Sequence, residues 1–277
     1  MVSLLAFIFI LGILIGFHEF GHYLAARLCG VGIETFSIGF GPRLIHKKIG
    51  LTDYRISLIP LGGYVKMVGD EPGRELKPEF ARLSFNGKPL WQKSLIAAAG
   101  PAFNFLLAII IFFGIFAFYG VPTKNSPNQL SFQKIKLSES ARLSVVVTGQ
   151  ITKLQVSDLV KMISGEISAK ENLYGPIAIY RMSGQNAKNR MSGQSAKKGA
   201  FDLFYLIAIL SISLAILNLL PIPTLDGGHL LFFGIEAVKG GPVNLKTKKI
   251  AQWAGSAIII ILIIFVFYND IARIFNK

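Results

Sequence analysis

Three ionisable residues near the N-terminus, His18, Glu19 and His22, have the types and the spacing of a hydrolytic metal site. Residues four apart on a helix lie one turn apart on the same face, so both imidazoles can reach one metal ion. Zinc lowers the pKa of a bound water from about 15.7 to near 7. Glu19 could take the proton of that water and pass it to a leaving amine. The spacing therefore predicts a zinc centre with Glu19 as the general base.

The position of these residues at the end of an apolar run favours a functional site. Ionisable groups inside a bilayer are energetically costly, and they usually mark function. The alternative is a polar cluster at the end of a helix whose side chains reach the membrane interface. We favour the metal site, because three such groups stand close together in the sequence.

A zinc hydrolase needs a third protein ligand, and a second polar segment offers one. Residues 218–229 (NLLPIPTLDGGH) contain two prolines and two glycines, so a helix must break there. Irregular backbone at membrane depth is tolerated only where protein buries it or a wet cavity lies beside it. Asp226 in this break is the expected third ligand, and His229 is its competitor. His46 stands among basic residues and is expected at the surface.

Asn218, at the start of the same segment, has two open interpretations. Its amide could donate hydrogen bonds to a substrate backbone or to a developing oxyanion. It could equally make a polar contact between helices. The sequence alone favours neither.

The composition indicates a membrane protein. Of the 277 residues, 52% are hydrophobic and 16% are charged, whereas soluble domains carry about a quarter charged residues. The net charge of +14 comes from Lys and Arg between apolar runs, without the interleaved aromatic residues of a nucleic-acid surface. Attraction to anionic lipid headgroups is the simpler explanation. The single cysteine, Cys29, excludes an internal disulfide and a cysteine-based zinc site.

Four apolar segments are candidates to cross the hydrocarbon core, which takes about 20 residues. They are Leu4–Leu28, Leu95–Tyr119, Phe201–Leu220 and Trp253–Phe267, the last of which is expected to start a few residues earlier. The first has no basic stretch before it and no small-residue cleavage pattern, so we interpret it as a retained span rather than a signal peptide. We predict a mainly α-helical membrane protein with about four transmembrane helices.

The segments between the spans predict a small β element and one more helix. Residues 36–67 are rich in Gly and β-branched residues and predict a β-hairpin or small sheet. Residues 69–89 are expected to form a loop, and residues 121–137 a linker. Residues 138–163 have helical periodicity, which fits a helix lying on the membrane or one packed against the spans. A near-identical octapeptide occurs twice within residues 181–197 and is expected to lengthen a loop or helix.

Five motifs give the chain a specific resemblance to the site-2 protease family of intramembrane zinc metalloproteases, and within it to the bacterial regulators of sigma-E type. They follow the family's order and cover most of the chain: HEFGH (18–22), FSIGFGP (36–42), IPLGGYVKM (59–67), AAAGPAFNF (97–105) and NLLPIPTLDGGHLLF (218–232). The resemblance implies one zinc ion held by His18, His22 and Asp226.

The resemblance also assigns further roles. It implies that Asn218 and Pro221 shape the substrate cleft. It also implies that GPAFN (100–104) contacts the catalytic region, with Asn104 among the residues that bind substrate. The hairpin at 36–67 would be the family's membrane-re-entrant β-loop, whose exposed edge could receive an unwound substrate as an added strand. The implied reaction is zinc-dependent cleavage within or near the transmembrane segments of single-pass proteins, to release an anti-sigma factor or to clear remnant signal peptides. Both termini would lie outside, with the site near the cytoplasmic side of the bacterial inner membrane.

The middle of the chain departs from the family. Members of this type usually carry one or two PDZ domains, of roughly 80 to 100 residues each, between the second and third spans. Only residues 121–138 precede the family-like helix here, so we predict no PDZ domain. We divide the chain into an N-terminal membrane half (1–120), a middle segment (121–200) and a C-terminal membrane half (201–277).

Two other functions fit the sequence less well. A metal transporter or sensor would need ligands spaced along a path through several spans, and only one cluster is visible in the sequence. An inactive scaffold would have no need of an intact set of His18, Glu19, His22 and Asp226.

Overall fold

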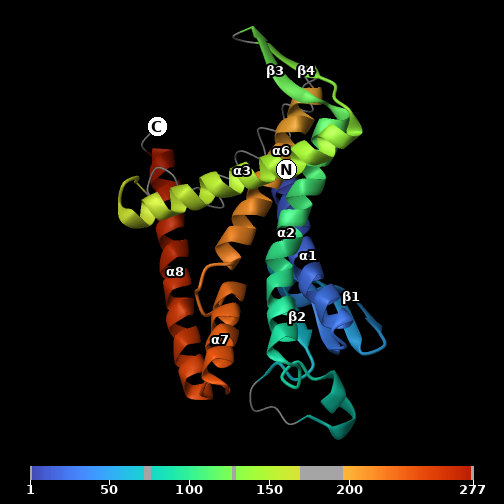
Figure 1. Cartoon of the computed structure of the whole chain (residues 1–277), viewed down its shortest axis with the longest axis vertical. Helices are drawn as coiled ribbons and strands as arrows, with labels where there is room; N and C mark the ends of the chain where they lie inside the picture. The colour runs from blue at the N-terminus through green and yellow to red at the C-terminus, as the bar shows by residue number, and fades with distance from the viewer. Residues whose placement is uncertain (1, 72–75, 127–128, 169–195, 276–277) are drawn as a thin grey trace. The chain divides into compact units, whose positions relative to one another are not determined.

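The structure, a computed structural model, describes residues 2–71, 76–126, 129–168 and 196–275 (Figure 1). Four helices in these ranges are long and apolar enough to cross a membrane: α1 (Val2–Leu28), α2 (Leu90–Phe118), α6 (Ala196–Asn218) and α8 (Leu245–Phe275). The predicted class, a mainly α-helical membrane protein with about four spans, is confirmed. Each helix starts a few residues before its predicted span, because hydropathy detects the apolar part of a helix and not its polar end.

The described chain forms two compact units. One unit comprises residues 1–10, 105–216 and 261–277, and the other comprises residues 11–104 and 217–260. The second unit contains every residue that the sequence singles out for chemistry. The repeated octapeptide at 181–197 lies almost wholly outside the described residues.

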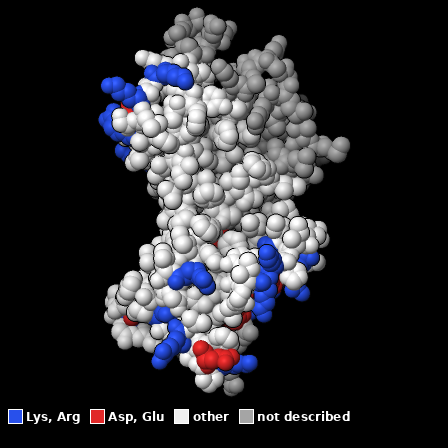
Figure 2. Space-filling model, turned by 90° about the vertical axis from the view of Figure 1, so that its right-hand side faces the viewer, with Lys and Arg blue, Asp and Glu red and all other residues white. Residues whose placement is uncertain are grey.

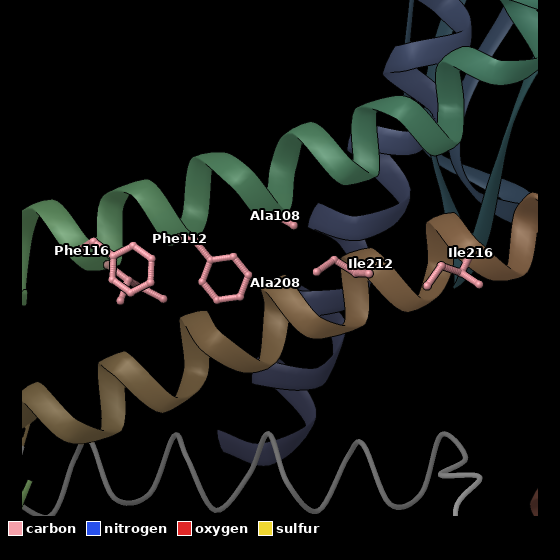
Figure 3. Close-up of a cluster of buried hydrophobic side chains, with 7 residues drawn as sticks. Ala108, Phe112, Phe116, Ala208, Ile212 and Ile216 are labelled. Atoms are coloured by element: carbon pink, nitrogen blue, oxygen red, sulfur yellow. The ribbon is translucent and has the colours of Figure 1, made fainter. Parts of the chain in front are cut away.

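The first unit is held together by apolar contacts between α2 and α6 (Figure 3). The cluster consists of Ala108, Phe112, Ile115 and Phe116 from α2 with Ala208, Ile212 and Ile216 from α6. Ala108 and Ala208 are both fully buried, and small residues of this kind let two helices approach closely where lipid supplies no hydrophobic drive.

Helix α3 (Leu137–Ser164) packs against this cluster through Leu143, Val147, Ile151 and Leu159. Gln155 donates a hydrogen bond from Nε2 to the Ile209 carbonyl of α6 (3.4 Å). These contacts favour the helix packed against the spans over a helix lying on the membrane. The predicted linker before α3 is wrong in part, because residues 121–133 contain a short antiparallel hairpin, β3 (Val121–Ser126) and β4 (Gln129–Gln133).

The second unit contains the predicted hairpin, formed by β1 (Ile33–Ile49) and β2 (Thr52–Met67). Its inner part pairs residues 35–38 with 63–66, and its outer part pairs 43–49 with 52–57. Residues 35–38 also pair with 53–56, which joins the two parts into one sheet. Gly39 and Gly41 lie between the two parts with φ of +95° and +83°, where side chains are strained. These glycines let β1 change direction and fold into a small sheet.

The hairpin and α1 pack on α2 through a core of small and branched side chains: Ala25, Ala26, Val31, Ile33, Ile96 and Ala99. A Cβ on Gly21 of α1 would overlap the Ala99 carbonyl oxygen of α2, so the two backbones are in direct contact there. The predicted loop at 69–89 contains one short 3₁₀ helix, η1 (Pro78–Leu83). One further helix, α7 (Asp226–Lys239), lies between the third and fourth predicted spans and was not predicted from the sequence.

Candidate metal centre

Helix α1 presents His18, Glu19 and His22 together inside the second unit. The three residues are 8%, 9% and 8% exposed, so all are shielded from solvent. The Nε2 atoms of the two histidines lie 3.2 Å apart, as expected for residues one helical turn apart on one face. The predicted pairing of the imidazoles is therefore present.

Asp226 reaches the same place from the far end of the sequence. Helix α6 ends at Asn218, an irregular segment follows, and α7 begins at Asp226. A Cβ on Gly227 would overlap the Leu219 and Leu220 carbonyl oxygens, and one on Gly228 would overlap the Ile222 carbonyl oxygen. Both glycines are therefore needed for the chain to fold back on itself and to place the carboxylate at the start of α7.

The three side chains have the spacing of ligands around one zinc ion. Asp226 Oδ2 lies 3.2 Å from His18 Nε2, and Asp226 Oδ1 lies 3.4 Å from His22 Nε2. Two ligands bonded at 2.0–2.1 Å to a tetrahedral zinc are about 3.3 Å apart. In the described part of the chain, no other group of three metal-binding side chains comes this close together, and His229 is not part of the group. The donor set of two nitrogens and one oxygen suits zinc.

Hydrogen bonds orient both histidines. His22 Nδ1 lies 2.8 Å from the Ile96 carbonyl oxygen, which can only accept, so Nδ1 carries the proton and Nε2 keeps its lone pair. The side-chain amide of Asn104 is fully buried and lies 3.1 Å from His18 Nδ1. Ligation through Nε2 needs the proton on Nδ1, so the amide would turn its oxygen towards Nδ1 and accept a hydrogen bond from it. Such outer contacts fix ring orientation at metal sites. Asn104 therefore supports His18, and its predicted contact with substrate stays a prediction.

Gly100 of α2 leaves the space that the histidine rings occupy. A Cβ there would overlap His22 Nε2 and would lie 2.8 Å from His18 Cε1. The family resemblance implies that residues 100–104 contact the catalytic region, but sequence reasoning did not single out the Ile96 carbonyl. The available signal was the small-residue motif at 97–105, which marks a close approach of helices.

Glu19 faces the inner part of the sheet. A Cβ on Gly63 of β2 would lie 2.7 Å from Glu19 Cγ and 2.9 Å from the Ile15 side chain. The Tyr23 and Tyr54 hydroxyls, 2.7 Å apart, join α1 to β2 one turn further on. The sheet thus lies directly beside the proposed general base.

The other predicted residues lie outside the cluster. Asn218 is the last residue of α6 and is partly buried, and Pro221 is exposed in the segment that follows. Within the described residues, neither is hydrogen-bonded to the three candidate ligands, and their predicted roles stay predictions. His46 is half exposed and pairs with Asp53 at 3.3 Å, as its surface assignment predicts.

Comparison with known proteins places the chain in a family. Its sequence matches Peptidase family M50 over residues 6–262. The chain belongs to this family. M50 is the site-2 protease family, so the protein is a zinc metalloprotease, and its four apolar helices make it a multi-pass membrane protein.

Three relatives illustrate the M50 similarity. The chain is 31% identical to "Putative zinc metalloprotease mll0638" of Mesorhizobium japonicum, over 97% of the chain and 98% of the relative. It is also 31% identical to "Putative zinc metalloprotease Cj1068" of Campylobacter jejuni, over 100% of the chain and 95% of the relative. It is 26% identical to "Regulator of sigma-W protease RasP" of Bacillus subtilis, over 99% of both chains.

The first of these M50 alignments is longer than the chain itself. It spans 372 positions, against 277 residues here, so at least 95 positions of the relative have no counterpart in this chain.

Proposed function

We propose that the protein is an intramembrane endopeptidase in which His18, His22 and Asp226 hold one zinc ion. The carrying observation is that donor atoms of each pair of these side chains lie 3.2–3.4 Å apart, close to the edge of a tetrahedral zinc site, with Asp226 using one carboxylate oxygen towards each histidine. The two histidines stand on a helix segment, Ile8–Leu28, that is apolar and long enough to span a membrane.

The residues around the site divide the work of hydrolysis. A bound zinc ion would supply Lewis acidity, which lowers the pKa of water enough for a hydroxide nucleophile to form near neutral pH. The Glu19 carboxylate accepts the proton of the attacking water and delivers it to the leaving amine nitrogen. The Ile96 carbonyl and the Asn104 amide keep the two imidazoles in the orientation that ligation needs.

The substrate we propose is a transmembrane segment of a single-pass protein. A helix must unwind before hydrolysis, because its carbonyls are already hydrogen-bonded within the helix. The sheet beside Glu19 offers an edge to which an extended segment can add as a strand. Asn218, the last residue of α6, and Pro221, in the segment between α6 and α7, would contact that strand near the site.

The setting we propose is the inner membrane of a bacterium, with the site towards the cytoplasm. All the relatives named above are bacterial, and one is named as a regulator of a sigma factor. Release of a membrane-bound anti-sigma factor or removal of remnant signal peptides would fit this setting.

We also propose that residues 121–200 form a middle segment without a PDZ domain. The alignment with the first relative spans 372 positions, against 277 residues in this chain. At least 95 positions therefore lack a counterpart here, which is about the size of one PDZ domain. Selection of substrates by such a domain would then be missing here.

The test is cleavage of a model transmembrane substrate by the full chain in detergent or liposomes. Glu19→Gln should abolish cleavage while the protein still binds one zinc ion, because it removes the base and leaves all three ligands. Asp226→Ala should lose both. Cleavage at the wild-type rate by Glu19→Gln would sink the mechanism, and full zinc content in Asp226→Ala would sink the ligand set.

A further inference from the structure

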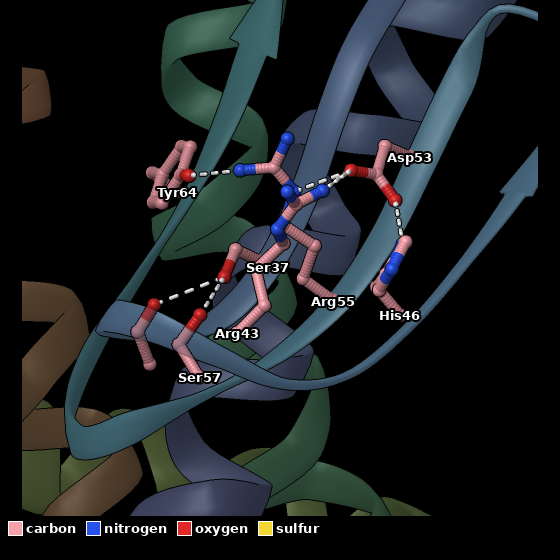
Figure 4. Close-up of polar contacts among 8 residues, drawn as sticks. Ser37, Arg43, His46, Asp53, Arg55, Ser57 and Tyr64 are labelled. Atoms are coloured by element: carbon pink, nitrogen blue, oxygen red, sulfur yellow. Dashed lines mark hydrogen bonds and ion pairs between the residues drawn. The ribbon is translucent and has the colours of Figure 1, made fainter.

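The outer part of the β1–β2 hairpin, residues 43–57, carries an excess of positive charge. It contains four Lys and Arg residues and His46, with Asp53 as its single acid. Figure 4 shows Arg43, His46 and Arg55 gathered around that one carboxylate, at 3.6, 3.3 and 2.7 Å. One carboxylate cannot neutralise this group, so the outer hairpin keeps a net positive charge.

Two of these four residues are lysines without an acidic partner among the residues described. Lys47 and Lys48 are exposed, and neither forms an ion pair with an acid in the part of the chain that the structure describes. The pattern extends beyond the hairpin, since blue side chains outnumber red ones on the face drawn in Figure 2. An unpaired cationic surface attracts anionic partners.

The strand register separates charge from apolar side chains. His46 lies opposite Arg55 and Lys48 opposite Asp53, so one face of the outer hairpin carries ionisable side chains. Ile45 lies opposite Ile56 on the other face, which also carries Ile49 and, opposite Tyr54, Lys47. One face thus holds three isoleucines and a single lysine, and the other holds the remaining ionisable side chains.

The isoleucines of this face are largely exposed, although Thr52 and Tyr54 on the same face contact the rest of the protein. Ile45, Ile49 and Ile56 are 67%, 58% and 50% exposed, and Leu44 at the bend is 61% exposed. A cluster of exposed branched side chains next to cationic groups is the pattern of a membrane-surface element, whose apolar side enters the acyl region.

The attachment of the hairpin to α1 sets its depth. Tyr54 of β2 bonds through its hydroxyl to that of Tyr23, which stands five residues before the last residue of α1, Leu28. At 1.5 Å per residue, this is about 7–8 Å from the end of the span. Aromatic hydroxyl groups of membrane proteins concentrate at this interfacial level. The outer hairpin therefore stands where headgroups are in reach.

We propose that the outer hairpin binds anionic phospholipid headgroups with its cationic face, while Ile45, Ile49 and Ile56 enter the acyl region beside them. The phosphate group is the ligand. Lys48, which forms no ion pair in the described part of the chain, and Arg43, which shares Asp53 with Arg55, are the groups that contact it. A soluble acidic peptide would leave the apolar face in water, which favours a lipid surface over a peptide partner. The proposal does not depend on the zinc site.

The experiment measures how deeply Ile45 enters the bilayer. The full chain carrying Cys29→Ser and Ile45→Cys is labelled with a polarity-sensitive fluorophore and placed in nanodiscs of phosphatidylcholine, with or without about one third phosphatidylglycerol. Quenching by lipids spin-labelled near the headgroup should rise at least two-fold with phosphatidylglycerol. Salt at 1 M, where the Debye length is about 3 Å, should remove the increase.

Matched variants locate the effect. Arg43→Gln with Lys48→Gln should abolish the increase, whereas Lys246→Gln with Lys249→Gln, which removes the same charge from exposed positions at the start of α8, should retain it. Equal quenching in both lipids, or an increase that survives the hairpin variant, would overturn the proposal. A loss of quenching when a soluble acidic peptide is added would also overturn it, because the peptide would then be the preferred partner. If the hairpin variant does not fold, the labelled parent protein provides the test. An increase in quenching that persists in 1 M salt would then overturn the proposal.

Discussion

His22 illustrates how a single hydrogen bond prepares a metal ligand. The Ile96 carbonyl fixes the proton on Nδ1, which leaves Nε2 as the donor atom facing Asp226 and His18. The pattern of His18, Glu19 and His22 in the sequence predicts the pairing, but it cannot predict this orientation. The carbonyl belongs to a different helix, and every residue has one.

Gly100 should be required for zinc binding and dispensable for the fold of α2. Gly100→Ala would push a methyl group into His22 Nε2, so we expect zinc affinity to fall about 10–100-fold, as it does when outer contacts of metal sites are disturbed. Gly114 lies on the same helix, where an added Cβ would meet open space. Competition with a chelator measures the affinity, and a similar loss in Gly114→Ala would contradict a specific role for Gly100.

Glu236 should stabilise the protein in a pH-dependent way. Its carboxylate is buried, lies 2.6 Å from Lys248 Nζ and accepts a hydrogen bond from the Val243 amide (3.0 Å). Burial alone would raise the pKa of Glu236, but these contacts lower it below the usual value. The stabilisation is thus complete above the unfolded pKa, about 4.3, and disappears as the pH falls through the lower folded pKa.

Glu236→Gln should therefore lower the unfolding free energy at pH 7 by about 1.5–3 kcal/mol, the contribution of hydrogen bonds to charged groups. Thermal unfolding of the purified protein measures this as a lower Tm. The gap between wild type and variant should close below pH 4. Glu79→Gln, at an exposed position of η1, should change neither. A gap that stays constant down to pH 3 would show that the carboxylate charge is not responsible.

At the scale of elements, the segment between α6 and α7 decides where Asp226 lies. The two prolines predict a break in the helix, and the structure has one. The sequence did not separate α7, because its start coincides with the break and the apolar pattern there runs on without a clear boundary. Residues 138–163 show a similar limit: their periodicity predicts a helix, but only the contacts with α2 and α6 show what covers it.

Gly255 of α8 should hold this segment in place. A Cβ at this position would lie 3.1 Å from Pro223 Cδ and 3.3 Å from the Thr224 nitrogen, which are backbone or ring atoms that cannot turn away. We expect Gly255→Val to displace Asp226 and to reduce cleavage and zinc affinity together, by at least ten-fold. Gly234→Val on α7, where the added group meets open space, is the control. Normal zinc affinity in Gly255→Val would show that the segment adapts.

At the scale of the whole molecule, apolar composition and motif order suffice to predict the class and the family. They do not predict the outer contacts of the site, which depend on packing between α1 and α2. The Gly21 contact with the Ala99 carbonyl is an example, since only three-dimensional proximity reveals it.

Zinc should act as a structural clamp as well as a cofactor. His18 and His22 belong to α1 and Asp226 to α7, so the ion would join two distant parts of the chain. A ligand at 1,000 times its Kd stabilises a protein by about 4 kcal/mol. Chelation should therefore lower Tm by several degrees, and readdition of zinc should restore it. Asp226→Asn should show no such response, and a chelator effect that persists in this variant would place the ion elsewhere.

The distance in sequence between His22 and Asp226 has a consequence for biosynthesis. If Asp226 completes the site, a nascent chain holds an incomplete donor set until about 200 further residues have left the ribosome after His22. At about 5–20 residues per second, this interval lasts about 10–40 s. During it, the partly inserted protease cannot cut neighbouring chains that enter the membrane through the same machinery. Activity then begins only when the C-terminal helices arrive.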